Sequence, residues 1–208
     1  MVGPAFIVFE GIDGAGKTLM LKLSKEFLLE KGVPAKKILL TAEPTSSSYG
    51  KKLRSLLSEE QDPKANARVF LELYLKDRKE HLSEEILPAL DKGKIVLCDR
   101  FKYSTIVYQG VQGIPVMELI AAHRGMRVPD AVFIFDLPEE VALRRINNSK
   151  SRSIEKFEKK EFLLKVRRGF LELRKILPEE NIKVFNADKP KEKVFEEVKA
   201  ELSKLLGF

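Results

Sequence analysis

Residues 11–18 read GIDGAGKT and match the phosphate-binding pattern G-x-x-x-x-G-K-[ST] in full. Glycines let the backbone curl so that its N–H groups face a polyphosphate, and the positive end of a following helix adds to the attraction. Lys17 is placed to reach the β- and γ-phosphates of a nucleoside triphosphate, and the Thr18 hydroxyl suits Mg²⁺. We therefore predict a site for ATP and Mg²⁺ made by Gly11, Ile12, Asp13, Gly14, Ala15, Gly16, Lys17 and Thr18.

A second pair of chemical groups, Asp99 and Arg100, follows an apolar run. If that run is a strand of a parallel sheet, the pair lies at its carboxyl end, where such sheets bind ligands. Asp99 would face the Mg²⁺. The planar guanidinium of Arg100 would neutralise an anionic acceptor phosphate, so that two negative groups can approach each other. The pattern indicates phosphoryl transfer, with Lys17, Asp99 and Arg100 as catalytic candidates and Thr18 and Asp99 as metal ligands.

Five short apolar runs rich in β-forming residues alternate with longer stretches of helical period. The runs occupy residues 6–9, 38–42, 95–99, 131–137 and 182–185. The helical stretches occupy residues 17–31, 64–91, 116–123, 138–148, 159–177 and 190–206. This alternation predicts an α/β fold, a five-stranded parallel sheet flanked by helices on both faces, in one domain spanning residues 1–208. The polar stretches at 43–48 and 147–153 are predicted to be mobile loops.

The composition argues against several other classes of protein. The apolar runs fall far short of the roughly 20 residues of a membrane span, and no secretory signal pattern opens the chain, so we expect a cytoplasmic protein with no membrane partner. Cys98 is the only cysteine, and His81 and His123 are isolated, which argues against disulfides and zinc. The net charge of +7 suits nucleic acid or polyphosphate equally. No nucleic-acid-binding motif accompanies it, so we expect no nucleic acid partner.

Several motifs occur in the order that is typical of one family. FEGIDGAGKT at 9–18, EPT at 43–45 and DRFKYSTIVYQG at 99–110 precede an Arg-rich stretch after residue 143. Over nearly its whole length the chain thus resembles the thymidylate kinase family of P-loop nucleoside-monophosphate kinases. The resemblance implies transfer of the γ-phosphoryl group of ATP to dTMP, a homodimer, and a lid at about residues 144–158.

The resemblance also implies how the acceptor nucleotide is held. Asp13 would lie close to the sugar 3′-hydroxyl, and Arg100 would hold the phosphate. In the family an aromatic residue four positions before an arginine stacks on thymine, while that arginine donates to a base carbonyl. Tyr74 and Arg78 match this spacing, which places both on one face of a helix.

Further acceptor contacts are implied for the segment that follows Arg100. Thr105 matches a position that hydrogen-bonds the pyrimidine. Tyr108 matches a position whose ring fills the space of a ribose 2′-hydroxyl and so favours deoxyribonucleotides. Gln109 also matches a substrate-binding position.

In the family the lid closes over the donor phosphates and supplies positive charge to the transferred group. The matching residues here are Arg144, Arg145, Lys150, Arg152 and Lys156. Some relatives carry an arginine inside the P-loop, where this chain has Gly14 and Ala15. The resemblance therefore implies that the catalytic cation comes from the lid, with Arg144 and Arg152 as candidates. It also implies that NADKP at 186–190 packs against the donor adenine.

Two other functions remain open at this stage. A kinase of another pyrimidine nucleotide or of a deoxynucleoside would use the same P-loop and a similar lid, although Arg78 and Arg100 favour an anionic acceptor. A nucleotide-dependent switch is the second, but the sequence lacks the N-K-x-D and strand-end D-x-x-G motifs of such proteins. We expect direct in-line transfer without a covalent enzyme intermediate or a general base.

Overall fold

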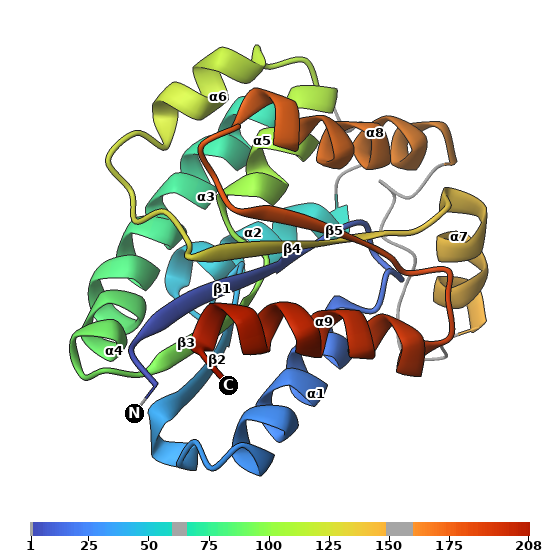
Figure 1. Ribbon diagram of the computed structural model, residues 1–208. Helices are drawn as coiled ribbons and strands as arrows, with labels where there is room; N and C mark the ends of the chain where they lie inside the picture. The colour runs from blue at the N-terminus through green and yellow to red at the C-terminus, as the bar shows by residue number, and fades with distance from the viewer. Residues whose placement is uncertain (1, 60–65, 149–159) are drawn as a thin grey trace.

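A parallel five-stranded sheet forms the centre of the molecule (Figure 1). The structure is a computed structural model that describes residues 2–59, 66–148 and 160–208. The strands are β1 (Ala5–Glu10), β2 (Ile38–Ala42), β3 (Ile95–Asp99), β4 (Ala131–Asp136) and β5 (Ile182–Asn186). They lie in the order β2-β3-β1-β4-β5, and every neighbouring pair is parallel. The predicted fold class is confirmed.

The strands are apolar because both faces of the sheet are covered by helices. All six residues of β1 are buried. At the carboxyl end of the sheet, Phe9 of β1 is in register with Asp99 of β3 and with Phe133 of β4. Phe9 also packs edge-to-face on Phe133, with ring centroids 5.5 Å apart. The register places the end of β1, where the P-loop begins, beside the acid that ends β3.

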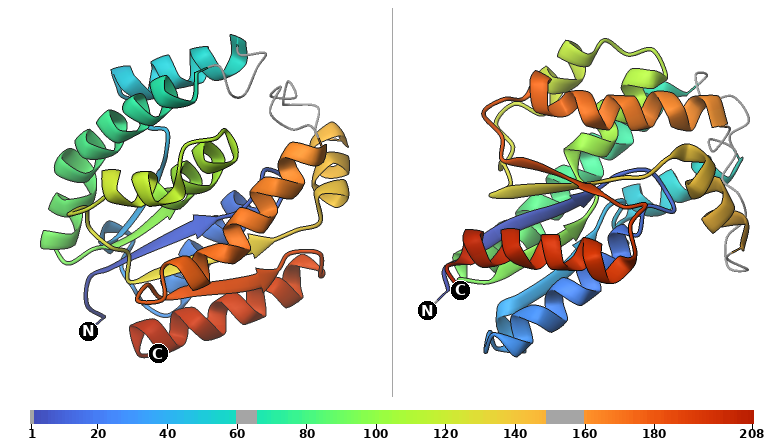
Figure 2. Two further views of the ribbon diagram at one scale, coloured as in Figure 1. Left: turned by 90° about the horizontal axis from the view of Figure 1, so that it is seen from above. Right: turned by 45° about the vertical axis from the view of Figure 1, so that its right-hand side comes forward.

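Helices cover both faces of the sheet, with more of them on one face than on the other (Figures 1 and 2). They are α1 (Lys17–Glu30), α2 (Ser48–Glu59), α3 (Ala67–His81), α4 (Leu87–Asp91), α5 (Lys102–Val111), α6 (Val116–Ala122), α7 (Glu139–Asn148), α8 (Lys160–Ile176) and α9 (Lys191–Leu206), with short turns at Ala35–Lys37 and Leu82–Ile86. Helices α1 and α9 lie on one face, and α3, α5 and α8 lie on the other (Figures 1 and 2). No helix of the described residues is long and apolar enough to cross a membrane.

The predicted element boundaries agree with the structure to within one residue for most elements. The stretch at 64–91 is the main exception, because its helical path from Ala67 to Asp91 changes hydrogen-bonding pattern on the way. Residues 64 and 65 lie outside the described residues, and α3 ends at His81. A π-helical turn at Leu82–Ile86 then precedes α4. Pro88 accounts for the irregular segment, because it has no N–H to donate to the carbonyl four residues earlier.

Two helices were absent from the sequence prediction. Helix α2 begins at Ser48, the last residue of the predicted loop at 43–48. Helix α5 follows β3 and carries the run Thr105, Ile106 and Val107, which intrinsic propensity places in strands. All three side chains are buried, Thr105 against Arg78 of α3 and Val107 against Gly169 of α8, and this packing overrides that preference. The predicted loop at 147–153 lies partly in α7, and its residues from 149 on lie outside the described residues.

Candidate active site

The P-loop joins β1 to α1 and depends on glycine at two backbone positions. Gly16, the N-cap of α1, has φ 88°, a left-handed conformation that side chains disfavour. At Gly11, with φ 136°, an added Cβ would meet the carbonyl oxygen of Phe135 at 2.6 Å. The loop is thereby held close to β4, and Gly16, Lys17 and Thr18 at the start of α1 line the cavity described below.

Lys17 lies in the first turn of α1 and is buried. Its Nζ donates to the carbonyl oxygen of Ile12 at 3.0 Å and lies 3.5 Å from Oδ1 of Asp13. Burial, followed by the positive charge of Arg100, lowers the pKa of Lys17. The ammonium group is thus poorly compensated by its surroundings. A bound polyphosphate would supply the missing negative charge.

Thr18 and Asp99 meet where the P-loop helix faces the end of β3. The Thr18 Oγ1 donates to Oδ2 of Asp99 at 2.5 Å. Hydroxyl and carboxylate oxygens are the ligands that Mg²⁺ prefers, and Mg²⁺ is commonly held by one or two such groups together with substrate phosphates. Within residues 2–59, 66–148 and 160–208 no cluster of three or more His, Cys, Asp or Glu side chains is placed to hold a metal ion. The predicted pair fits a Mg²⁺ that is shared with a nucleotide.

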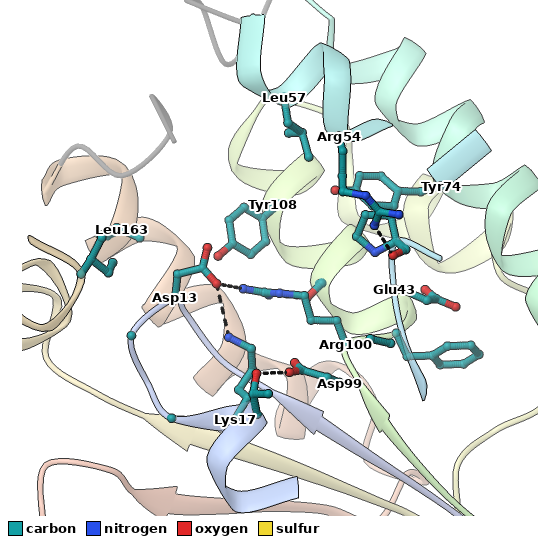
Figure 3. Close-up of a pocket in the computed structure, with 18 of the residues that line it drawn as sticks. Asp13, Lys17, Glu43, Arg54, Leu57, Tyr74, Asp99, Arg100, Tyr108 and Leu163 are labelled. Atoms are coloured by element: carbon teal, nitrogen blue, oxygen red, sulfur yellow. Dashed lines mark hydrogen bonds and ion pairs between the residues drawn. The ribbon is translucent and has the colours of Figure 1, made fainter. Parts of the chain in front are cut away.

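Arg100 immediately follows β3 and has a constrained backbone. Its φ of 71° is the only positive value for a non-glycine residue among the described residues. Its Nη2 lies 2.5 Å from Oδ1 of Asp13, and its Nη1 donates to Oγ of Ser104 at 2.8 Å. The guanidinium also lies 5.4 Å from the ring centroid of Tyr108. The side chain is therefore held on three sides and directed across the P-loop (Figure 3).

Glu10, at the end of β1, was quoted in the FEG motif but given no role, and the structure shows that it supports Arg100. The fully buried carboxylate accepts from the N–H of Phe101 at 2.7 Å and from the N–H and hydroxyl of Ser104 at 3.2 and 2.6 Å. Burial raises its pKa despite the opposing charge of Arg100. The carboxylate caps the start of α5 from a neighbouring strand and so fixes the turn that carries Arg100.

Arg78, at the far end of the cavity from Lys17, is buried in α3. Its Nε donates to Oε2 of Glu43 at 2.8 Å, and its Nη2 donates to the hydroxyl of Thr105 at 3.0 Å. Its Nη1 lies 2.6 Å from Nε2 of His123. Thr105 thus contacts Arg78 and is not among the residues that line the cavity. Glu43 belongs to the EPT motif, which was recognised without assigning a role to the carboxylate.

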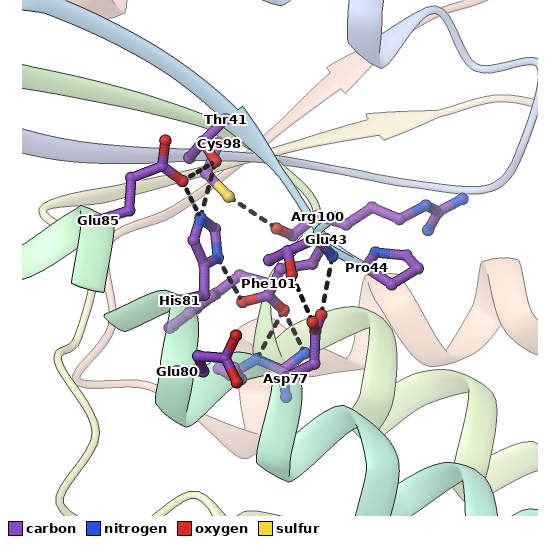
Figure 4. Close-up of polar contacts among 12 residues, drawn as sticks. Thr41, Glu43, Pro44, Asp77, Glu80, His81, Glu85, Cys98, Arg100 and Phe101 are labelled. Atoms are coloured by element: carbon purple, nitrogen blue, oxygen red, sulfur yellow. Dashed lines mark hydrogen bonds and ion pairs between the residues drawn. The ribbon is translucent and has the colours of Figure 1, made fainter. Parts of the chain in front are cut away.

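The segment after β2 is held by a second set of polar contacts (Figure 4). Asp77 of α3 accepts hydrogen bonds from the N–H and hydroxyl of Thr45 at 2.9 and 2.5 Å and from the hydroxyl of Ser47 at 2.7 Å. Nδ1 of His81 lies 3.1 Å from Oε1 of Glu43, the carboxylate that also pairs with Arg78. These contacts join the EPT segment to α3 and fix Glu43 beside Arg78.

One cavity of about 580 Å³ connects the P-loop with Arg78. Figure 3 shows Lys17, Asp99 and Arg100 on one side and Tyr74 and Arg54 on another, with Tyr108 between. Its lining consists of Asp13, Gly14, Gly16, Lys17, Thr18, Leu19, Ala42, Glu43, Pro44, Arg54, Leu57, Tyr74, Arg78, Asp99, Arg100, Phe101, Ser104, Tyr108, Gln109, Gln112, Arg145, Ile146 and Leu163. Sequence reasoning missed Arg54, Leu57, Gln112, Ile146 and Leu163, which carry no motif.

The predicted acceptor residues are brought together, with differences in detail. Tyr74 and Arg78 both line the cavity, as expected for two residues on one helix face. Tyr108 packs against Phe162 and Phe170 with ring centroids 6.2 Å away in each case. Gln109 lines the cavity and donates to Gln112. Its buried Oε1 accepts no hydrogen bond from the described residues.

Arg145, one of the residues that the resemblance assigns to the lid, lines the cavity beside the P-loop. Its Nη1 lies 3.4 Å from the carbonyl oxygen of Gly14, and its Nη2 donates to the carbonyl oxygen of Ala187 at 3.2 Å. Ala187 belongs to the NADKP segment, so this arginine links the P-loop to the predicted adenine loop. The candidate Arg144 is exposed and does not line the cavity. Lys150, Arg152 and Lys156 lie outside the described residues.

The charges of the cavity suit two anionic ligands. Lys17 and Arg145 lie beside the P-loop, and Arg100 stands between the P-loop and the space bordered by Tyr74 and Arg78. One phosphate can bind to the P-loop N–H groups, and a second phosphate can bind to Arg100. The two phosphates would then lie next to each other between Lys17 and Arg100. The arrangement can therefore bring two phosphorylated molecules together for transfer between them.

Comparisons with known proteins agree with this geometry. The sequence profile of the family described as thymidylate kinase matches residues 9–198. The chain is 41% identical over 212 residues to a thymidylate kinase of Prochlorococcus marinus, covering 97% of both chains. It is 41% identical over 182 residues to a probable thymidylate kinase of Pyrococcus horikoshii, covering 85% of this chain and 86% of the relative. The crystal structure of thymidylate kinase from Ehrlichia chaffeensis superposes with a TM-score of 0.75 at 32% identity, covering 96% of this chain and 99% of that one.

Proposed function

The chain belongs to the thymidylate kinase family, and we propose that the cavity between the P-loop and Arg78 is where it transfers the γ-phosphoryl group of ATP to dTMP. The activity is that of a thymidylate kinase, which phosphorylates dTMP to dTDP. The observation that carries the assignment of the site is the single cavity that joins Lys17 to Tyr74 and Arg78. It has one cationic end for a triphosphate and one aromatic and hydrogen-bonding end for a base.

The donor end holds the phosphates of ATP. The N–H groups of the P-loop and the start of α1 surround the β- and γ-phosphates, and the buried Lys17 neutralises them. Arg145 borders the same end and links Gly14 to the NADKP segment, which supports contact between that segment and the adenine. Thr18 and Asp99 would hold the Mg²⁺, which when bound neutralises charge on the phosphate oxygens.

The acceptor end holds dTMP so that its phosphate faces the donor. Arg100 binds that phosphate with its planar guanidinium. The carboxylate of Asp13 lies beside Arg100, so it is placed to accept a hydrogen bond from the sugar 3′-hydroxyl. Tyr74 stacks on thymine, Arg78 donates to a base carbonyl, and the ring of Tyr108 fills the space that a 2′-hydroxyl would need. Thr105 acts at the base through its contact with Arg78, and Gln109 borders the same end.

The reaction is a direct in-line displacement. An oxygen of the dTMP phosphate forms a bond to the γ-phosphorus of ATP while the bond to the bridging β–γ oxygen breaks, and the leaving charge stays on ADP. The attacking oxygen is already ionised near neutral pH, so no side chain has to remove a proton. Lys17 and Arg100 bring the two anions together, and Arg145 and the lid residue Arg152 supply positive charge to the transferred group.

A coupled assay of ADP release tests this assignment. ATP and Mg²⁺ are supplied in parallel with dTMP, dUMP, UMP, CMP, AMP or thymidine as acceptor. We expect dTMP to give the highest kcat/KM and UMP to be turned over poorly. Equal turnover of thymidine would contradict the role of Arg100, and ATP hydrolysis without transfer to any monophosphate would favour a nucleotide switch instead.

We also propose that the enzyme is a homodimer. The support is the resemblance of nearly the whole chain to a family of dimers. Light scattering after size-exclusion chromatography measures the mass directly. A mass of 23.7 kDa at micromolar concentration would identify a monomer and contradict the proposal.

A further inference from the structure

We propose that His123 is a positioning residue for the acceptor nucleotide, because it holds the guanidinium of Arg78 in the orientation that recognises the base. The inference rests on the proposed role of Arg78 in binding dTMP. His123 directly follows α6, is 4% exposed and does not line the cavity, so it acts through Arg78 and not on the nucleotide itself.

The two ring nitrogens of His123 have different partners. Nδ1 lies 2.7 Å from the carbonyl oxygen of Leu119, and a carbonyl can only accept a hydrogen bond. The ring therefore carries its proton on Nδ1 and presents a lone pair at Nε2. Nη1 of Arg78 lies 2.6 Å from Nε2 and can only donate. The contact with Leu119 thus fixes the tautomer that Arg78 requires.

The remaining contacts of Arg78 show what His123 contributes. Nε and Nη2 both face Oε2 of Glu43, at 2.8 and 2.6 Å, and Nη2 also donates to Thr105. The guanidinium lies 5.2 Å from the ring centroid of Phe101. These contacts hold one edge and one face of the group. His123 accepts a hydrogen bond from one of the two N–H groups of Nη1. The other N–H group remains to donate to a base carbonyl in the cavity.

The charge state of His123 supports this role. Burial, followed by the positive charge of Arg78, lowers the pKa of His123 to about 3. The ring stays neutral under working conditions and keeps accepting from Arg78. A protonated imidazole would present a donor to a donor and would push the guanidinium away.

The test compares single and double variants by equilibrium binding of dTMP without ATP, measured by calorimetry, and by steady-state kinetics. His123→Gln keeps an acceptor at about the distance of Nε2, whereas His123→Asn is a polar amide too short to reach Arg78. His123→Phe removes the acceptor while keeping the ring. Arg78→Met, alone and combined with His123→Phe, reports whether the histidine acts through the arginine.

We expect His123→Asn and His123→Phe to weaken dTMP binding about tenfold and to raise the KM for dTMP equally. The value of kcat and the KM for ATP should stay within about twofold of wild type, and His123→Gln should bind dTMP nearly as wild type does. In the Arg78→Met background, His123→Phe should change dTMP binding no further.

Two results overturn the inference in distinguishable ways. If Arg78→Met weakens dTMP binding but His123→Asn and His123→Gln both bind normally, His123 has no positioning role while the proposed function stands. If Arg78→Met binds dTMP as wild type does, the proposed role of Arg78 fails and this inference fails with it. Thermal unfolding of each variant identifies loss of fold, and the Asn and Gln pair decides the question if the Phe variant is unfolded.

Discussion

Nη2 of Arg100 lies 2.5 Å from Oδ1 of Asp13, so an ion pair joins the residue after β3 to the P-loop across the cavity. The two side chains are 17% and 19% exposed, so a ligand can reach both. Arriving dTMP would replace the carboxylate on Arg100 with its phosphate and would free Asp13 for the sugar. The second contact of Arg100, with Ser104, would hold the guanidinium in place during this exchange.

Substitution of Arg100 should separate catalysis from stability. Arg100→Gly and Arg100→Ala both remove the phosphate contact, and we expect each to lower kcat/KM for dTMP by at least about a hundredfold. The positive φ of 71° strains any residue with a Cβ, so Arg100→Gly should be more stable than Arg100→Ala by about 1 kcal/mol. Chemical denaturation and the ADP-release assay measure the two effects. Equal stability of the variants would show that the backbone relaxes at this position.

Two adjacent arginines of α7 provide a matched pair. Both side chains are exposed, but Arg145 lines the cavity and contacts Gly14 and Ala187, whereas Arg144 does not line the cavity. We expect Arg145→Ala to lower kcat about tenfold or more and to raise the KM for ATP, while Arg144→Ala should change both by less than about twofold. Single-turnover kinetics with saturating dTMP separates the chemical step from product release. A larger effect at Arg144 would support the assignment made from the sequence.

The parts of the site that sequence reasoning predicted are those whose residues are close together in the chain. The P-loop occupies eight consecutive residues, and Asp99 and Arg100 adjoin an apolar run whose buried strand was recognisable. Tyr74 and Arg78 are one helical turn apart, so their common face follows from helix geometry. In these cases local spacing determines the three-dimensional arrangement.

The supporting contacts could not be predicted in the same way, because they join distant segments. Glu10 caps α5 from 94 residues away, and Arg78 reaches Glu43 and His123 across 35 and 45 residues. Apolar periodicity shows which face of an element is buried, not which buried polar groups meet. The same limit explains why α5 was missed, since its β-branched run is helical in the context of its packing against neighbouring helices and of the Glu10 cap.

Mg²⁺ dependence tests the pairing of Thr18 with Asp99. Asp99→Asn keeps a hydrogen-bonding oxygen but removes the charge, and we expect the Mg²⁺ concentration for half-maximal rate to rise about 10- to 100-fold. Thr18→Ser keeps the hydroxyl and should resemble wild type. Titration of the rate with Mg²⁺ at fixed ATP gives the comparison. An unchanged Mg²⁺ requirement in Asp99→Asn would mean that the ion is held by other groups.

The ring of Tyr108 should control discrimination by the sugar. It packs against Phe162 and Phe170 and lies beside Arg100, so it cannot easily move aside for a 2′-hydroxyl. We expect Tyr108→Ala to reduce the preference for dTMP over ribothymidine 5′-monophosphate about tenfold, chiefly by improving the ribonucleotide. Tyr108→Phe keeps the ring and should retain the preference. Loss of turnover with both nucleotides to the same extent would argue for a positioning role instead.

The buried His123 should make the fold sensitive to acid. Burial and the charge of Arg78 lower the pKa of His123 from 6.5 to about 3. Between these two pH values the histidine is therefore protonated in the unfolded chain and neutral in the folded protein. The stability that His123 contributes is complete above pH 6.5 and is lost progressively as the pH falls toward 3. His123→Gln has no titrating group, so between pH 7 and pH 5 wild type should lose about 2 kcal/mol more free energy of unfolding than the variant. Urea denaturation of both proteins at the two pH values measures this difference. If both proteins lose the same free energy of unfolding, the pKa of His123 is not lowered by folding and the prediction is wrong.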